Sequence, residues 1–308
     1  MRIMAPASNC KDAEQILING AEDIYVGGHW EKYKNYSFTG RGEKAHSGKQ
    51  ILASISEIHQ MADMVHCFGG KLYFLANTPF VHDSFRKKDE SQIKDFLNYV
   101  EQGINLGADY VLLGDLGAIS LVKKKFPNIE IAASSYLEVQ NELCIKLLEE
   151  LGVSQTILSY QCSLKEIEYL CKTTNMKVEV FGHGGCSFYV GTCNMFHEMG
   201  EEKVHIGYPC KATYQVKYKE ELKEMKALDS FKMCSICSLK FLYEYGVHSL
   251  KIVGRDLDAS YITQIVKVYS VMLKKIANNE SMEEINSILP TWWKKAWCNC
   301  NNLCKYIE

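Results

Sequence analysis

Eight short runs of apolar, β-forming residues recur along the chain, and segments with helical spacing separate them. Continuous apolar strands that alternate with amphipathic helices are typical of parallel strands buried on both faces. Eight strand–helix pairs predict an α/β fold, a TIM-like (β/α)8 barrel. The runs cover residues 2–7, 23–28, 71–77, 110–115, 129–134, 155–160, 177–184 and 249–255.

Four of the expected helices end in a glycine that is followed by a small or branched apolar residue and then by a strand. Such a glycine supplies a left-handed C-cap, and the apolar residue packs back on the helix. The repeat favours four βαβα units that close into a barrel, with an open doubly wound sheet as the alternative. The pairs are Gly20-Ala21, Gly107-Ala108, Gly152-Val153 and Gly246-Val247.

The pattern predicts a barrel over residues 1–280 and a tail over 281–308 that is rich in cysteine and tryptophan. Two long segments interrupt the alternation. Residues 28–50, after the second strand, are polar and aromatic, and residues 185–235, after the seventh, form a cysteine-rich insertion. Long βα loops stand at the carboxyl face of a barrel, so functional residues are expected in these segments.

The composition of the chain and the motifs that it lacks argue against several classes of function. The net charge of −2 gives no support for a nucleic-acid partner held by bulk charge, although it leaves room for a local basic groove. Without an apolar leader or a membrane-length apolar stretch, we expect a cytoplasmic protein with no membrane partner. The chain has no GxSxG, HExxH, GxGxxG or P-loop motif, which argues against a serine triad, a zincin and a tightly bound nucleotide.

Thirteen cysteines in a chain expected in a reducing compartment favour metal binding or catalysis over disulfides. Three of them, Cys67, Cys144 and Cys171, lie in apolar helical patterns and are expected to be small core residues. Five others lie in the insertion after the seventh strand or just before the eighth, among glycines that allow tight turns. These are Cys186, Cys193, Cys210, Cys234 and Cys237.

An iron–sulfur cluster needs about four converging thiolates, and the five cysteines can supply them. Zinc is the alternative metal, but only Cys234 and Cys237 have the CxxC spacing of structural zinc sites. Unligated thiols are the third interpretation.

The tail adds Cys298, Cys300 and Cys304. These thiols could contribute ligands to the same centre, form a second site with Cys234 and Cys237, or have no role. Three tail tryptophans are expected to pin the tail to the barrel rather than to bind a base. They are Trp292, Trp293 and Trp297.

Five polar residues stand where barrel strands deliver catalytic groups. His183 follows the seventh strand, and Arg255 ends the eighth, where an anion clamp is expected. Glu179 could move protons inside the barrel or pair with Lys251. Position alone also singles out Asn77 and Asp115.

Over nearly its whole length the sequence resembles the collagenase-like peptidase family U32, whose members have a TIM-type barrel. Some members are named proteases without accepted catalytic residues. Others carry a [4Fe–4S] cluster and act in oxygen-independent hydroxylation of ubiquinone precursors, or of uridine or cytidine in tRNA and ribosomal RNA. The motifs that carry the resemblance are "MAPA", "GADYVLLGDLG", the region of Asn141, "VEVFGHGGCSFYVGTC", "YPCKATY" and "GVHSLKIVGR".

The resemblance implies a ligand set. Cys186, Cys193 and Cys210 match the first three ligand positions of the cluster-bearing members, and the fourth is Cys234 or Cys237. The implied function is a hydroxylation or related modification of an RNA base or a small aromatic or biosynthetic substrate. His183 or Glu179 would move protons, and Arg255 would orient an anionic substrate.

Two alternatives remain beside this function. One is a peptidase that uses a cysteine or a metal centre. The other is a non-catalytic subunit that carries a cluster for a protein partner.

Overall fold

The computed structural model describes residues 1–30, 52–77, 91–184, 212–228, 233–254, 257–298 and 304–306. Within them, eight parallel strands form a closed barrel in the order β1-β10-β7-β6-β5-β4-β3-β2. Each of the eight predicted runs contains one of these strands, so the predicted barrel is confirmed. The strands are β1 (Arg2–Pro6), β2 (Asp23–Val26), β3 (Lys71–Leu75), β4 (Tyr110–Leu113), β5 (Glu130–Ala133), β6 (Gln155–Ile157), β7 (Lys177–His183) and β10 (Ser249–Ile252).

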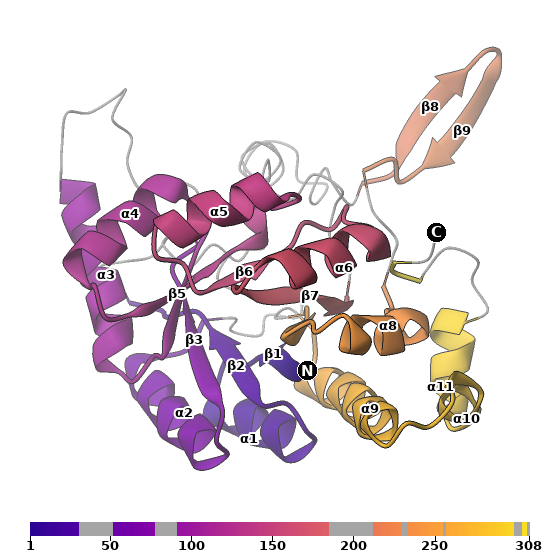
Figure 1. Cartoon of the computed structure of the whole chain (residues 1–308), viewed down its shortest axis with the longest axis horizontal. Helices are drawn as coiled ribbons and strands as arrows, with labels where there is room; N and C mark the ends of the chain where they lie inside the picture. Colours follow the sequence, from indigo (N-terminus) through magenta and orange to yellow (C-terminus); the bar gives the residue numbers. More distant parts are fainter. Residues whose placement is uncertain are drawn as a thin grey trace.

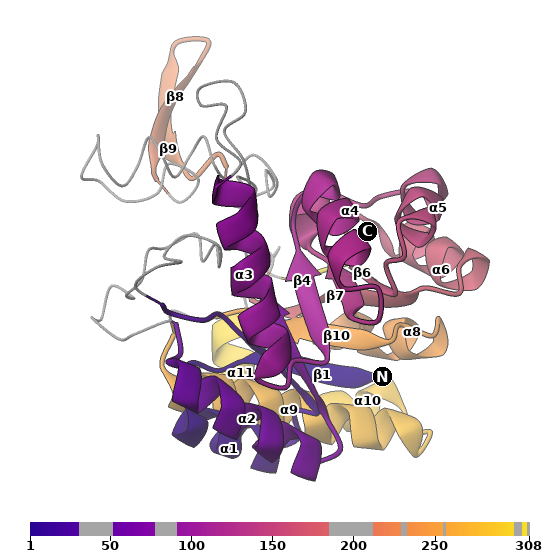
Figure 2. The same ribbon diagram turned by 90° about the vertical axis from the view of Figure 1, so that its left-hand side faces the viewer.

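Helices follow most of the strands and cover the outside of the barrel (Figure 1). In Figure 2, α1, α2 and α9 lie together along one side, and α1 contacts both of the others. The longer helices are α1 (Cys10–Ile18), α2 (Ile55–Cys67), α3 (Ser91–Asn105), α4 (Leu116–Lys125), α5 (Glu142–Glu150), α6 (Leu164–Thr173) and α9 (Ala259–Ala277). The shorter ones are η1 (Ser135–Leu137), η3 (Ile236–Ser238), α8 (Leu239–Glu244), α10 (Met282–Ser287), α11 (Thr291–Trp293) and η4 (Lys294–Cys298). Among the described helices, none combines the length and the apolar character that crossing a membrane requires.

The four predicted glycine caps are present, each with a positive φ between 79° and 107°. After α1, the Gly20 N–H donates to the Leu17 carbonyl and the Ala21 N–H donates to the Ile16 carbonyl. The other three helices end with the same pair of bonds. This repeated ending turns the chain sharply from the helix into the next strand, as the barrel requires.

The barrel has two separate apolar layers. One fills the lumen and includes Tyr25, Tyr73, Tyr110 and Phe181, with Tyr73 and Tyr110 stacked at a centroid distance of 4.4 Å. The other, larger layer lies between the outer face of the strands and the helices. The lumen is therefore packed with side chains, as in other barrels of eight strands.

The insertion after β7 contains an antiparallel hairpin, β8 (Tyr214–Tyr218) and β9 (Glu221–Met225), which extends away from the barrel in Figure 1. After the hairpin, the chain continues through η3 and α8 to β10, the last barrel strand. The segments that hold Cys186, Cys193 and Cys210, and the loop over 31–51, lie outside the described residues.

The tail folds back on the barrel. Trp293 is fully buried, with its ring 5.8 Å from Tyr269 of α9, so the prediction that it pins the tail is confirmed. Trp292 is 37% exposed and contributes less contact. One prediction about the cysteines is wrong, because Cys67 is exposed. It lies two residues beyond Val65, the last residue of the buried stripe of α2, and therefore points away from the core.

Candidate functional site

Three segments that are distant in sequence meet at the carboxyl end of β7. Cys234 forms an antiparallel bridge with His183 and a parallel bridge with Cys304. The Lys305 N–H donates to the Cys234 carbonyl at 2.7 Å. Residues opposite each other in a bridge present their side chains on one face. His183, Cys234 and Cys304 therefore share a face, which we call the thiol face.

His183 is enclosed by aromatic rings and is 1% exposed. The centroid of its ring lies 5.1 Å from the ring centroids of Trp293 and Trp297 and 5.9 Å from that of Tyr269. These three rings lie outside the barrel lumen. Within the described part of the chain, neither ring nitrogen has a hydrogen-bond partner. Burial lowers the pKa of His183 to about 3, and the charge of Lys305 acts in the same direction. The ring is therefore neutral at pH 7, and its role in moving protons stays a prediction.

The thiols on the thiol face and beside it differ in exposure. Cys234 is 3% exposed, and burial raises its pKa to about 12. Cys237 is exposed, and its thiol lies close enough to that of Cys304 for the two to interact. Burial and the neighbouring Cys304 raise the pKa of Cys237, and Cys298 lies close enough to Cys237 for their charges to interact. Two of the tail cysteines, Cys298 and Cys304, are thus beside the CxxC pair rather than apart from it.

The predicted metal ligands fall in two groups. Cys186, Cys193 and Cys210 lie outside the described residues, whereas Cys234 is paired with the residue that precedes Cys186 by three positions. In the part of the chain that the structure describes, no group of three or more His, Cys, Asp or Glu side chains is arranged to hold a metal ion. The buried thiol of Cys234, beside the start of the ligand segment, fits the donor chemistry of an iron–sulfur or zinc centre.

Glu179 is fully buried in the barrel lumen and bonded by neighbouring strands. Gln155 Nε2 donates to one carboxylate oxygen at 2.9 Å, and Ser249 Oγ donates to the same oxygen at 2.6 Å. Lys251 Nζ lies 3.4 Å from the other oxygen, which confirms the predicted ion pair. Burial raises the pKa of Glu179, and the Lys251 charge opposes that change. A proton-transfer role for Glu179 stays a prediction.

Lys305 and Tyr160 meet at the carboxyl end of the lumen, and no sequence pattern pointed to either residue. Lys305 is 2% exposed and donates a hydrogen bond to the Tyr160 hydroxyl, with Nζ 3.7 Å from the ring centroid. Tyr160 in turn donates to the Gly184 carbonyl. Lys305 comes from a short tail segment without periodicity, so no pattern could place its ammonium beside Phe181 at the end of β7.

The remaining candidates have different surroundings. Asp115 caps α4, because its Oδ1 accepts a hydrogen bond from the Ala118 N–H at 2.7 Å. Asn77 is 5% exposed, and its Oδ1 has no partner among the residues that the structure describes. Arg255 lies outside those residues. Asn77 therefore remains a candidate at the strand ends, and Asp115 has a structural role.

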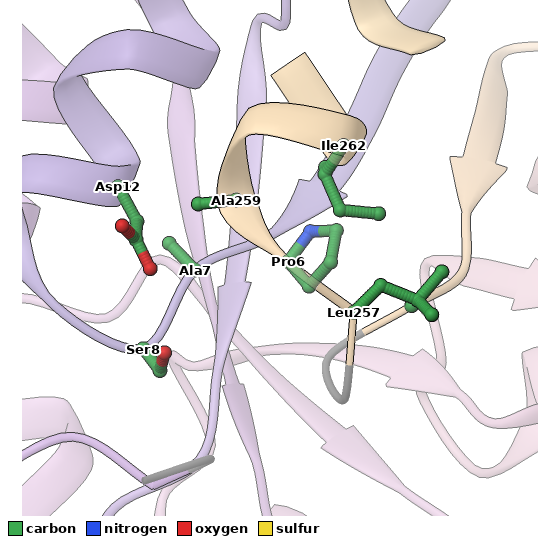
Figure 3. Close-up of a pocket in the computed structure, with 8 residues that line it drawn as sticks. Pro6, Ala7, Ser8, Asp12, Leu257, Ala259 and Ile262 are labelled. Carbon is green, nitrogen blue, oxygen red and sulfur yellow. The ribbon is translucent and has the colours of Figure 1, made fainter. Parts of the chain in front are cut away.

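A small, shallow hollow opens at the carboxyl ends of β1 and β10, beside the start of α9 (Figure 3). Its polar side chains are those of Ser8 and Asp12. In Figure 3 the apolar side chains of Pro6, Leu257 and Ile262 occupy the opposite side. None of the cysteines of the thiol face lines this hollow.

Curated relatives match most of the chain. It is 26% identical over 288 residues to the 23S rRNA 5-hydroxycytidine C2501 synthase of Escherichia coli (strain K12), covering 90% of this chain and 40% of that protein. It is 23% identical to tRNA hydroxylation protein P of the same organism, covering 87% of this chain and 66% of that protein. It is 22% identical to tRNA hydroxylation protein P1 of Bacillus subtilis (strain 168), covering 97% of this chain and 68% of that protein. The chain thus spans less than two thirds of the first two relatives.

Solved structures support the fold. The structure of the U32 peptidase Mk0906 has a TM-score of 0.52 at 10% identity, covering 82% of this chain and 93% of that one. The octameric ribulose-1,5-bisphosphate carboxylase/oxygenase of Pyrococcus horikoshii has a TM-score of 0.50 at 9% identity, covering 93% and 62%. At such identities the likeness concerns the fold alone. The model of peptidase family U32 matches residues 8–302, and the chain belongs to that family.

Proposed function

We propose that this protein takes part in the hydroxylation of an RNA base and carries an iron–sulfur centre for that purpose. The observation that carries the proposal is the family match over residues 8–302, together with relatives that are named for hydroxylation of ribosomal RNA and tRNA. The relatives share the barrel region, since most of this chain aligns with each of them.

Cys186, Cys193, Cys210 and Cys234 would hold a [4Fe–4S] cluster. Cys234 is preferred to Cys237 because it is buried and is bridged to His183, three residues before the first expected ligand. Cys237 is exposed, and its pKa is raised by burial and by the neighbouring Cys304. When bound, the cluster would supply a redox or Lewis-acid centre.

The protein's own residues would shape the surroundings of that centre. A neutral imidazole can donate one hydrogen bond and accept another, so His183 can orient a polar group without placing a charge beside the thiols. Lys305 would keep a positive charge at the carboxyl end of the lumen, on the rings of Tyr160 and Phe181. Arg255, three residues after the last barrel strand in the sequence, would bind a phosphate or another anionic group of the substrate.

Iron and sulfide quantification after anaerobic purification tests the cluster. We expect about four irons per chain, broad visible absorbance, and loss of iron in Cys186→Ser, Cys193→Ser, Cys210→Ser and Cys234→Ser. Cys144→Ser and Cys171→Ser are matched controls, because these cysteines pack on the core in α5 and α6. A colourless protein with stoichiometric zinc would favour the alternative metal, and a metal-free protein would refute the centre.

Nucleoside mass spectrometry tests the reaction. RNA from cells that lack the gene should lose one nucleoside that is heavier by one oxygen than its parent, and the wild-type gene should restore it. The Cys186→Ser variant should fail to restore it at equal protein level. If all hydroxylated nucleosides persist in both ribosomal RNA and tRNA, RNA hydroxylation is wrong for this protein.

The peptidase alternative gains no support from the described residues. A cysteine peptidase needs a thiolate that is activated by a neighbouring charged histidine. Burial instead lowers the pKa of His183 and raises the pKa of Cys234. Proteolysis of unfolded collagen or casein by the metal-loaded protein, lost in a single cysteine variant, would reverse this preference.

A further inference from the structure

The tail segment over residues 304–306 is tied to η3, to Cys234 just before it and to β7. Ser238 Oγ donates to the Lys305 carbonyl at 3.0 Å and lies 3.3 Å from the Tyr306 carbonyl. The Tyr306 hydroxyl donates to the Phe181 carbonyl at 3.1 Å, and the Cys234–Cys304 bridge completes the attachment. The two segments are thus held together by groups other than their thiols.

This attachment brings one pair of thiols close together, those of Cys237 and Cys304. Cys237, in η3, is exposed, and Cys304 is half-buried, so a small reagent can reach the pair from solvent. Cys237 adjoins Ser238, whose Oγ donates to the Lys305 carbonyl, and Cys304 adjoins Lys305, so the two thiols lie close to each other. Cys234, by contrast, is 3% exposed and interacts with the Tyr269 hydroxyl on the inner side of the same face.

We propose that Cys237 and Cys304 form an oxidisable dithiol, separate from the proposed cluster ligands, whose disulfide fastens the tail to η3. The oxidant class is a low-molecular-weight disulfide such as glutathione disulfide. One protein thiolate attacks its S–S bond and releases one thiol, and the second protein thiolate attacks the mixed disulfide and releases another. Two protein thiols become one S–S bond, and the two released glutathione molecules carry the electrons and protons.

The described residues favour a dithiol over a second metal site. Metal coordination by thiolates needs three or four donors around one centre, and no such group is present in the part of the chain that the structure describes. A disulfide needs only two thiols in contact on segments that are already aligned. Cys298 is the competing partner for Cys237, because the two thiols interact electrostatically.

Peptide mapping under non-reducing conditions tests the pairing. The full-length protein is treated with glutathione disulfide, alkylated and digested with trypsin. We expect peptide 233–240 joined to peptide 296–305, with loss of the joined species in both Cys237→Ser and Cys304→Ser. Cys298→Ser is the matched control from the same tail peptide and should keep the joined species. Exposed Cys67 should form only a glutathione adduct.

Two further measurements test the dithiol independently of the proposed iron–sulfur cluster. Oxidation should raise the midpoint of thermal unfolding in the wild type and not in Cys304→Ser. Iron content in Cys304→Ser should equal that of the wild type, whereas Cys186→Ser should lose iron if the cluster proposal holds. A Cys237–Cys298 link, glutathione adducts without a link, or iron loss in Cys304→Ser would each overturn the dithiol, whatever the iron content of Cys186→Ser.

Discussion

The carboxylate of Glu179 and the ammonium of Lys251 face each other inside the barrel, with Oε1 and Nζ 3.4 Å apart. Glu179 is 0% exposed and Lys251 is 8% exposed, so each charge depends on the other for compensation. Removing one partner leaves an uncompensated buried charge, which typically costs about 3–5 kcal/mol. The pair therefore links the two neighbouring strands β7 and β10 by more than their backbone bonds.

We predict that Glu179→Gln and Lys251→Met each lower the free energy of unfolding by about 3 kcal/mol or more. The double variant should lose clearly less than the sum of the two single variants, because no unpaired charge remains. Urea denaturation of the four proteins gives this coupling. Additive losses would mean that the two side chains do not stabilise each other.

Trp293 should be the main anchor of the tail. It is fully buried against Tyr269 and His183, so Trp293→Ala should cost about 3–5 kcal/mol and expose the tail to limited proteolysis. Trp292→Ala is the matched control, because the adjacent ring is 37% exposed and should cost much less. Equal effects of the two substitutions on the denaturation midpoint would contradict this assignment.

Alanine substitutions at Gly246 and Gly20 allow the cost of backbone strain to be distinguished from the cost of a steric clash. Gly246 has φ +82°, and a Cβ added there would meet open space, so Gly246→Ala should cost about 1–2 kcal/mol from backbone strain alone. A Cβ at Gly20 would lie 2.1 Å from Ser270 Oγ, so Gly20→Ala should cost more. Thermal unfolding of both variants measures the difference. The double variant Gly20→Ala with Ser270→Gly should recover part of the loss.

The carboxylate of Asp109 should contribute to the loss of folding stability at acidic pH. Burial would raise the pKa of Asp109, but hydrogen bonds from Lys71 Nζ, the Leu72 N–H and His66 outweigh it, so the folded pKa is lowered. The stabilisation is therefore complete above the unfolded pKa of about 3.9 and is lost as the pH falls below it. The stability difference between the wild type and Asp109→Asn should shrink from pH 5 to pH 2, whereas exposed Asp63→Asn should show little difference at any pH.

The strands could be predicted because each is an apolar run and half of them follow a glycine cap, both of which are local signals. The thiol face could be predicted only in part. The CxxC pair is visible in the sequence, but the pairing of Cys234 with His183 and Cys304 depends on contacts over 51 and 70 residues. Lys305 could not be predicted for the same reason, since a single lysine in an aperiodic segment carries no information about burial.

The helical cysteines show a limit of pattern-based prediction. Cys144 and Cys171 pack against the core, as predicted, but only their positions beside Ile145 and Leu170 make them half-buried. Cys67 has apolar neighbours in sequence, yet it falls off the stripe formed by Ile58, Met61, Ala62 and Val65. Each residue of a helix is rotated by about 100° from the one before it. Whether a helical cysteine is buried or exposed therefore depends on its angular position relative to the buried stripe, not on the apolar character of its neighbours in sequence.

The pairing of β1 with β10 also constrains how the chain is made. Arg2, Ile3 and Met4 pair with Ser249, Leu250 and Lys251, so the first strand leaves the ribosome long before its second partner is synthesised. Until then, the nascent sheet keeps an open edge of unpaired backbone groups. Closure of the ring is therefore a late event in biosynthesis, and aggregation of the nascent chain should be greatest just before residue 252 emerges.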